Sequence, residues 1–271
     1  YSSGAIAGPY PCNPLPVKLH PSPLQVATSA SGKKCAVIDM SYPRGQSVND
    51  AIPDIWTQIP GFQGQFRLPT HESVCQAIMQ LEDPVMYVVD MAAYYMQLCS
   101  DPCDYPYLAF AWRQAVWIHR RLPFGCRSAC LHAQRVTDAI TKIHSELSKD
   151  FIAGYVDDFT SILERIRGII GYKSFKELFH TLGVDNAPEK DQIPRVLHLY
   201  LRLLYNLLTR SLHLPEDKLC RVLSVLGQWM EKDSCCKQDV ECLLGLLNHV
   251  AVVVPAGRPF CAHILDILKS Q

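Results

Sequence analysis

Apolar and polar positions alternate in short blocks through the middle of the chain, and longer apolar repeats with helical spacing fill its last third. Residues 85–89 form a short apolar run of the length of a buried strand. A second run, residues 151–154, leads through Tyr155 and Val156 to Asp157 and Asp158, and Phe159 follows. This pattern predicts a strand, a tight turn that carries two acids, and a returning strand.

The last third of the chain is predicted to be mainly helical. Residues 196–208 are rich in leucine with mixed periodicity, which leaves strand and helix open for this stretch. Pro215 suits the first turn of a helix in which Glu216 and Asp217 face the positive end of the helix dipole. Residues 222–230, 240–252 and 262–268 are predicted to form further amphipathic helices.

Length and composition predict a folded protein with a sizeable core. The chain has 271 residues, of which 48% are hydrophobic and 19% charged. No apolar run approaches the roughly 20 residues that span a bilayer, so we expect no membrane partner. Residues 1–23 lack the layout of a signal peptide, and we expect them to form an extended arm. Because the chain starts at Tyr1, we also expect it to be a fragment of a longer protein.

Twelve cysteines are scattered without a regular spacing. A disulfide framework would show regular spacings in a short chain, and a zinc site would show paired Cys-x-x-Cys spacings, which Cys99 and Cys103, Cys126 and Cys130, and Cys235 and Cys236 do not form. We therefore interpret them as free thiols in a reducing compartment, either the cytoplasm or the nucleus.

Three carboxylates are candidates for metal chemistry: Asp90, which follows the first apolar run, and the pair Asp157 and Asp158. Magnesium prefers oxygen ligands and needs only a few carboxylates when substrate phosphates supply the rest. An acidic pair in a turn is also common for purely local reasons, since aspartate favours turns.

Four motifs appear in an order that resembles the palm of reverse transcriptases. They are Asp90 followed five residues later by Tyr95, the LPFGCRSA segment at 122–129, the YVDDF segment at 155–159, and Pro-Glu-Lys at 188–190. Residues 38–50 are similar to the fingers segment of DIRS-type retrotransposons, which carry a tyrosine recombinase. Residues 214–219, 244–249 and 254–260 resemble the segment that follows the palm in those elements.

The resemblance implies an α+β right-hand polymerase fold with an antiparallel palm sheet, fingers and a partial helical thumb. It places an amino-terminal arm and fingers at 1–84, a palm at 85–211 with a fingers insertion at about 97–121, and a thumb-like segment at 212–271. A plain helical bundle that packs on the palm would give the same pattern in the last segment.

The function that the resemblance implies is that of an RNA-directed DNA polymerase. Its partners would be an RNA or DNA template with a primer and deoxynucleoside triphosphates, and its cofactor would be Mg²⁺ or Mn²⁺. Two ions would be held by the carboxylates of Asp90 and Asp157, with Asp158 beside them. Tyr95 would lie beneath the sugar of the nucleotide. A structural role for Tyr95, as an aromatic ring packed in the core, would explain the same motif equally well. The other nucleotide-binding candidates are Phe124, Gly125, Lys190, Lys33 and Lys34.

Departures from the family pattern keep a second function open. Ser29 and Cys35 stand where related fingers carry a lysine and an arginine. Compared with the family pattern, Tyr94 replaces a small residue and Cys130 replaces a proline. Arg202 replaces the glycine of the primer-grip turn. The formal net charge is zero, whereas phosphate binding usually demands an excess of cations. A retroelement-derived module that binds nucleic acid or protein without efficient catalysis is therefore the alternative.

Overall fold

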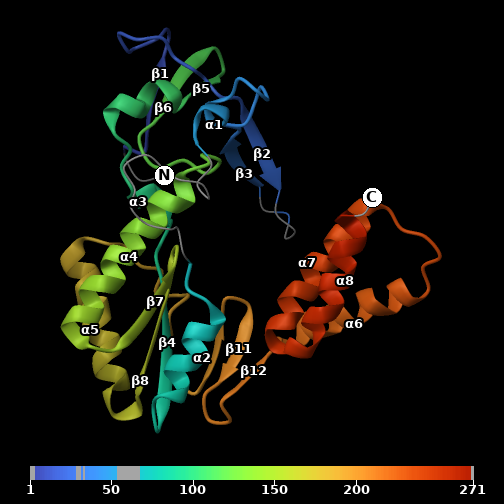
Figure 1. The fold of residues 1–271 in the computed structure, drawn as a ribbon. Coiled ribbons are helices and arrows are strands. Elements are labelled where there is room, and N and C mark those ends of the chain that lie inside the picture. The colour runs from blue at the N-terminus through green and yellow to red at the C-terminus, as the bar shows by residue number, and fades with distance from the viewer. Residues whose placement is uncertain (1–3, 29–31, 33, 54–67, 270–271) are drawn as a thin grey trace. The chain divides into compact units, whose positions relative to one another are not determined.

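The computed structural model describes residues 4–28, 32, 34–53 and 68–269 (Figure 1). By internal contacts the chain divides into two compact units. The first unit comprises Tyr1–Pro69, Val89–Phe159 and Lys173–Asp191, and the second comprises Thr70–Val88, Thr160–Tyr172 and Gln192–Gln271.

Two small antiparallel sheets lie in the first unit. β1 (Ile6–Tyr10), β6 (Ala115–His119) and β5 (Ala109–Trp112) pair in that order, and β2 (Leu24–Thr28) pairs with β3 (Lys34–Ile38). Their core contains Ile38, Met40, Leu108 and Phe110. Within the segment expected to form an extended arm, Ile6 lies opposite His119, so this segment also contributes a sheet strand.

The short elements of the first unit are α1 (Val48–Ala51), α3 (Tyr94–Gln97) and the 3₁₀ turn η1 (Pro102–Tyr107). Ser47 and Asp50 form a capping box at the start of α1, in which each side chain bonds to the backbone N–H of the other residue.

A four-stranded sheet has the order β7-β8-β4-β9, made of β7 (Phe151–Tyr155), β8 (Asp158–Glu164), β4 (Pro84–Asp90) and β9 (Gln192–Arg195). Strands β4 and β8 each begin in one unit and end in the other. All seven residues of β4 are buried, as a continuous apolar run requires. The predicted strand at 85–89 and the predicted acidic hairpin are both confirmed.

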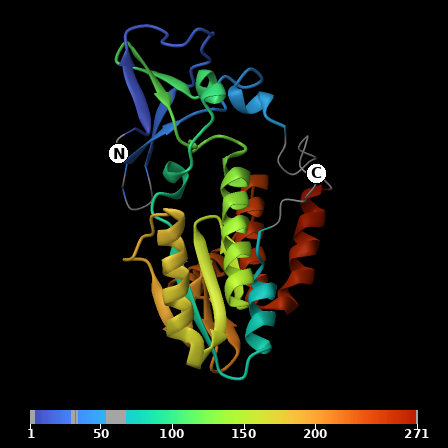
Figure 2. The ribbon, with the colours of Figure 1, turned by 90° about the vertical axis from the view of Figure 1, so that its left-hand side faces the viewer.

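Helix α4 (Ala129–Ser148) runs beside β7 (Figure 2). It buries Leu131, Gln134, Thr137, Ile140 and His144, which recur every three or four residues and so share one face. Gly154 of β7 faces that helix, and a Cβ atom there would lie 2.3 Å from Cγ2 of Thr137. Only glycine allows this close approach of strand and helix.

Aromatic rings pack beneath the acidic hairpin in the first unit. Helix α5 (Gly168–Leu182) contributes Phe175 and Phe179, whose ring centroids are 4.7 Å apart. Phe159 of β8 lies 5.3 Å from each of them. All three rings are almost fully buried. The strand that follows the two acids is thus anchored by large apolar contacts.

The second unit holds α2 (His71–Met79), η2 (Arg165–Arg167) and a three-stranded sheet of β10 (Leu197–Tyr200), β11 (Leu203–Asn206) and β12 (Ser211–His213). The stretch at 196–208 is therefore a β-hairpin. Arg202 lies in its turn with a φ of 65°. This left-handed conformation suits the glycine of the related pattern better than arginine.

Three helices follow: α6 (Glu216–Met230), α7 (Lys237–Val253) and, after η3 (Pro255–Gly257), α8 (Arg258–Lys269). The predicted helix start at Glu216 is confirmed, with Pro215 as its N-cap. Helices α7 and α8 lie side by side (Figure 1), and they share a core of Leu244, Ala251 and Cys261. In the described part of the chain, no helix combines the length and the apolar character needed to cross a membrane.

Candidate active site

The three candidate acids come together in the first unit. Asp90 ends β4, Asp157 lies in the turn between β7 and β8, and Asp158 begins β8. The backbone N–H of Met91 donates a 3.0 Å hydrogen bond to the carbonyl oxygen of Asp157. This bond joins the end of β4 to the acidic turn. Two segments far apart in the sequence therefore present their carboxylates to one place.

Burial and neighbouring charges raise the pKa of Asp157 and Asp158. Burial, then the charges of Asp157 and Asp90, and a hydrogen bond with Asp90 raise the pKa of Asp158 to about 7. The pKa of Asp157 is also raised, first by burial and then by the charge of Asp90. Where the charge of one carboxylate raises the pKa of its neighbour in this way, a bound cation is stabilising.

Lys190 supplies a positive charge to this site. Its Nζ lies 2.7 Å from Oδ1 of Asp90, and the two side chains are 57% and 10% exposed. The hydrogen bond to Asp90 is the main reason that the pKa of Lys190 is raised. The sequence placed Lys190 near a triphosphate, whereas the structure pairs it with a catalytic candidate.

Two polar residues of α4, which the sequence did not single out as site residues, hold the acidic turn. The Gln134 side chain donates from Nε2 to the carbonyl oxygen of Gly154 and accepts at Oε1 from the N–H of Val156, both at 2.8 Å. Thr137 donates its hydroxyl to the carbonyl oxygen of Val156. Val156 has a φ of 54°, a strained region for a β-branched residue. These bonds stabilise the turn in that conformation.

The spacing of Gln134 and Thr137 puts them on one helix face, which is the only sequence signal that could have found them. Their burial, at 1% and 0% exposed, makes the hydrogen bonds to the turn a requirement, since buried polar groups need partners.

Tyr95 lies near Asp157 and packs against Phe124. Their ring centroids are 4.7 Å apart, and Phe124 is 55% exposed. Burial raises the pKa of Tyr95 to about 12, and the charges of Cys130 and Asp157 add to the shift. Tyr95 therefore lies within electrostatic range of the acidic turn.

The neighbouring Tyr94 serves a different purpose. Its ring is 2% exposed and its hydroxyl donates a 2.6 Å hydrogen bond to the carbonyl oxygen of Ala133 in α4. A small residue at this position could not make that contact, so the bulky substitution is accommodated by bonding to α4. The charge of Asp157 acts on both tyrosines, but the Tyr94 hydroxyl bonds to α4 in the core, whereas the Tyr95 ring packs against Phe124.

Asn49 fixes the loop that carries Phe124 and Gly125. Its Nδ2 donates to the carbonyl oxygen of Gly125 at 2.7 Å, and its Oδ1 accepts from the N–H of Arg127 at 2.8 Å. Gly125 has a φ of 102°, and a Cβ there would lie 2.5 Å from the carbonyl oxygen of Ile38. The loop is thus held against the preceding sheet in a form that only glycine permits.

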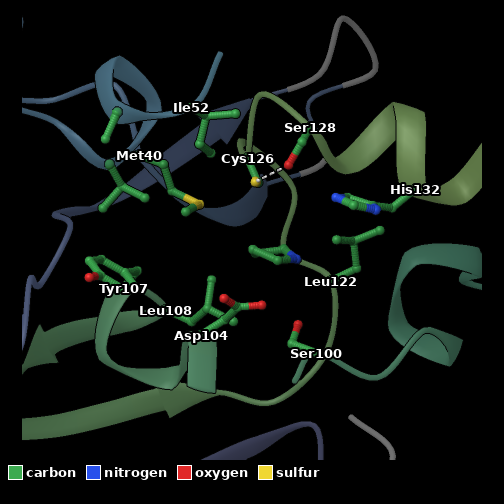
Figure 3. Close-up of a pocket in the computed structure, with 13 residues that line it drawn as sticks. Met40, Ile52, Ser100, Asp104, Tyr107, Leu108, Leu122, Cys126, Ser128 and His132 are labelled. Atoms are coloured by element: carbon green, nitrogen blue, oxygen red, sulfur yellow. Dashed lines mark hydrogen bonds between the residues drawn. The ribbon is translucent and has the colours of Figure 1, made fainter. Parts of the chain in front are cut away.

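A cavity of about 310 Å³ is lined in part by this loop (Figure 3). Leu122, Cys126 and Ser128 line it, and Sγ of Cys126 lies 3.4 Å from Oγ of Ser128. None of the three acids lines it. The loop therefore presents Phe124 to Tyr95, and Leu122, Cys126 and Ser128 to a separate, mainly apolar cavity.

Of the two lysines proposed at the fingers, the structure describes Lys34. Lys34 begins β3 and is exposed, and among the described residues its ammonium pairs with none of the three acids. Lys33 and Ser29 lie outside the described residues. Cys35 is placed on β3 by its backbone.

The acids as they stand do not form a finished metal site. Within the ranges that the structure describes, no three His, Cys, Asp or Glu side chains are arranged to hold a metal ion. Lys190 instead takes one oxygen of Asp90. The arrangement is a cluster of oxygen donors with a built-in ammonium group.

Comparison with known proteins gives the fold. No protein-family model matches the chain, and no curated protein matches it. Among solved structures, one match is the foamy viral protease-reverse transcriptase dRH in complex with double-stranded DNA. The match covers 99% of this chain and 41% of the viral chain, with a TM-score of 0.69 and 15% sequence identity. The same viral enzyme in complex with an RNA/DNA hybrid matches 98% of this chain and 34% of its own, with a TM-score of 0.62 and 14% identity.

A third structure of that enzyme, in complex with double-stranded DNA, matches 98% of this chain and 54% of its own, with a TM-score of 0.59 and 15% identity. The chain therefore spans only 34 to 54% of the length of these relatives in structure. At such identities the likeness concerns the fold. The chain has the mixed helical and antiparallel-sheet fold of reverse transcriptases, as the sequence predicted.

Proposed function

We propose that this chain is the polymerase portion of an RNA-directed DNA polymerase, which transfers deoxynucleotides to a primer 3′-hydroxyl. The observation that carries the proposal is the convergence of Asp90, Asp157 and Asp158, whose segments are joined by the 3.0 Å hydrogen bond from the N–H of Met91 to the carbonyl oxygen of Asp157. Phosphoryl transfer relies mainly on positioning and on cations that neutralise developing charge. A cluster of carboxylates at the end of a strand and a hairpin turn suits that chemistry.

Magnesium fits the donors of this cluster. All three are carboxylates, the hard oxygen ligands that Mg²⁺ prefers, and their repulsion is relieved by a cation. When bound, two such ions lower the pKa of the attacking hydroxyl and stabilise the triphosphate charge. Asp90 and Asp157 are the proposed ligands, and Asp158 supports them. Lys190 would leave Asp90 and turn to the phosphates of the nucleotide.

The residues around the acids have proposed roles in holding the nucleotide. The Tyr95 ring would lie under the sugar and exclude a 2′-hydroxyl, and Phe124 and Gly125 would form the floor beneath the base pair. Lys34 and Lys33 are proposed to approach the triphosphate from the fingers. The relatives in structure were solved with double-stranded DNA and with an RNA/DNA hybrid, and we propose the same class of partner here. The likeness of residues 38–50 supports a DIRS-type origin.

A primer-extension assay tests the proposal. The chain, its Asp157→Asn variant and an Asp185→Asn control would be given a labelled primer on RNA and DNA templates with deoxynucleotides and Mg²⁺. Asp185 is exposed and close in sequence to Lys190, so the control removes a nearby charge without touching the cluster. We expect extension by the chain and the control only. Equal extension by all three proteins, or by none, rejects the polymerase.

A second function is favoured by the contact between Lys190 and Asp90 at 2.7 Å. If this ion pair persists when Mg²⁺ and nucleotide are present, the chain is a module that binds nucleic acid or protein without efficient catalysis. Binding of a fluorescent primer–template by the chain, in the absence of any extension, is the result that selects this alternative.

A further inference from the structure

A buried ion pair lies directly behind the acid cluster. Nζ of Lys176, on α5, is 2.5 Å from Oδ2 of Asp191. The Asp191 side chain is only 4% exposed and that of Lys176 is 25% exposed. A carboxylate buried to this degree is stable only with its partners in place. None of the motifs identified in the sequence includes either residue.

Asp191 also contacts the strand that ends in Asp90. Its Oδ2 accepts a 3.2 Å hydrogen bond from Nδ2 of Asn186, and its Oδ1 lies 3.4 Å from the backbone nitrogen of Asp90. The preceding residue, Lys190, bonds to the Asp90 carboxylate. Consecutive residues therefore hold Asp90 at its backbone and at its side chain.

A tight turn connects these contacts. The N–H of Ala187 donates to the carbonyl oxygen of Asp90 at 2.9 Å. Within the turn, the N–H of Lys190 donates to the carbonyl oxygen of Ala187 at 2.9 Å, and the N–H of Asp191 donates to the carbonyl oxygen of Pro188 at 3.3 Å. The turn at 187–190 is thus fixed to β4 at one end and to α5, through Asp191, at the other.

We infer that Asp191 and Lys176 are positioning residues, which lock the turn at 187–190 so that Lys190 and the Asp90 carboxylate keep a fixed relative geometry. The catalytic part of this inference rests on the proposed polymerase function. The positioning part rests on the contacts alone. Loss of the Lys176 charge leaves the buried Asp191 carboxylate without its ion pair, and loss of the Asp191 charge removes the link between the turn and α5.

Hydrogen exchange tests the positioning part without any need for activity. Amide exchange would be measured by mass spectrometry in the chain and in Asp191→Asn, Lys176→Met and the double variant. The control is Asp83→Asn, which breaks an exposed ion pair with Arg165 of 2.7 Å. We expect amides of 187–191 to exchange at least about tenfold faster in both single variants, because local opening becomes easier. Peptides from α4 should keep their protection.

The inference is overturned if exchange at 187–191 does not change, or if α4 loses protection to the same degree, since that would mean a general loss of stability. Because the double variant leaves neither charge alone, it should unfold at a higher temperature than either single variant, and it supplies a folded protein if the single variants are unstable.

Primer extension tests the catalytic part. In Asp191→Asn we expect kcat to fall at least about tenfold while KM for the deoxynucleotide and Kd for the primer–template stay unchanged, as lost positioning predicts. Unchanged kcat contradicts it. If the unaltered chain extends no primer, the proposed function fails, and the exchange experiment still decides whether Asp191 and Lys176 fix the turn.

Discussion

The side-chain oxygen Oε1 of Gln134 accepts a hydrogen bond of 2.8 Å from the backbone N–H of Val156, the residue that precedes Asp157. Helix α4 thereby sets the backbone of the acidic turn. Since Val156 has a φ of 54°, the turn depends on contacts outside itself. The catalytic candidates are held by residues that take no part in the proposed chemistry.

Replacing Gln134 with leucine should destabilise the chain and the turn together. The N–H of Val156 and the carbonyl oxygen of Gly154 would lose their partner, at a cost of about 1–3 kcal/mol for a buried polar group. Urea unfolding measures this free energy, and extension should fall as well. Gln76→Leu on the exposed face of α2 is the control and should change the free energy by less than about 0.5 kcal/mol. Equal effects of both substitutions would contradict the assignment.

Adjacent tyrosines should give opposite results. Tyr95→Val should increase ribonucleotide incorporation relative to deoxynucleotide incorporation, because the ring proposed to lie under the sugar is removed. Tyr94→Phe should leave that selectivity unchanged and lower the free energy of unfolding by about 1 kcal/mol, because its hydroxyl bonds to Ala133. Single-nucleotide incorporation and urea unfolding measure the two effects. A selectivity change in the Tyr94 variant would refute the separation of roles.

Removal of the ammonium group from the acid cluster should strengthen cation binding. Lys190→Met takes away the positive charge that lies 2.7 Å from Asp90, so Mn²⁺ meets less repulsion and gains a free oxygen. We expect Kd for Mn²⁺, measured by electron paramagnetic resonance, to fall several-fold. Asp90→Asn should weaken Mn²⁺ binding instead. Weaker binding in the Lys190 variant would show that the lysine supports the ion and does not compete with it.

The stability of the second unit should depend on pH through His198. This side chain is 1% exposed, and burial, with a further contribution from Arg195, lowers its pKa from 6.5 to about 4. Stability from this group is therefore complete above pH 6.5 and is lost as the pH falls towards 4. We expect a loss of about 2 kcal/mol between pH 7 and pH 5. His198→Leu should flatten this part of the pH profile of urea unfolding, and His213→Leu, at an exposed position, should not.

The elements were predictable where a local pattern fixed them. The buried run of β4, the acidic hairpin and the start of α6 at Glu216 each depend on residues that are neighbours in sequence. The contacts that complete the site join distant segments: Asn49 to Gly125, Lys190 to Asp90 and Gln134 to the acidic turn. The residue pattern of a single sequence does not indicate which distant segments contact each other.

Two further features depended on backbone geometry that residue types do not specify. Tyr94 and Tyr95 look alike in the sequence, and the left-handed Ala93, with a φ of 45°, precedes the short helix in which the two rings take up different surroundings. The amino-terminal arm has no strand pattern of its own, and it becomes β1 only because β6 offers a partner. The predicted domain boundaries after residues 84 and 211 stay predictions.

The measurement that tests the central claim most directly is the rate of incorporation of one templated deoxynucleotide as Mg²⁺ is titrated. The account predicts saturable incorporation by the unaltered chain, and a loss of at least about a hundredfold in both Asp90→Asn and Asp157→Asn, since removal of either ligand disables charge stabilisation in the transition state. Incorporation that persists undiminished in either variant, or that needs no divalent cation, would contradict it.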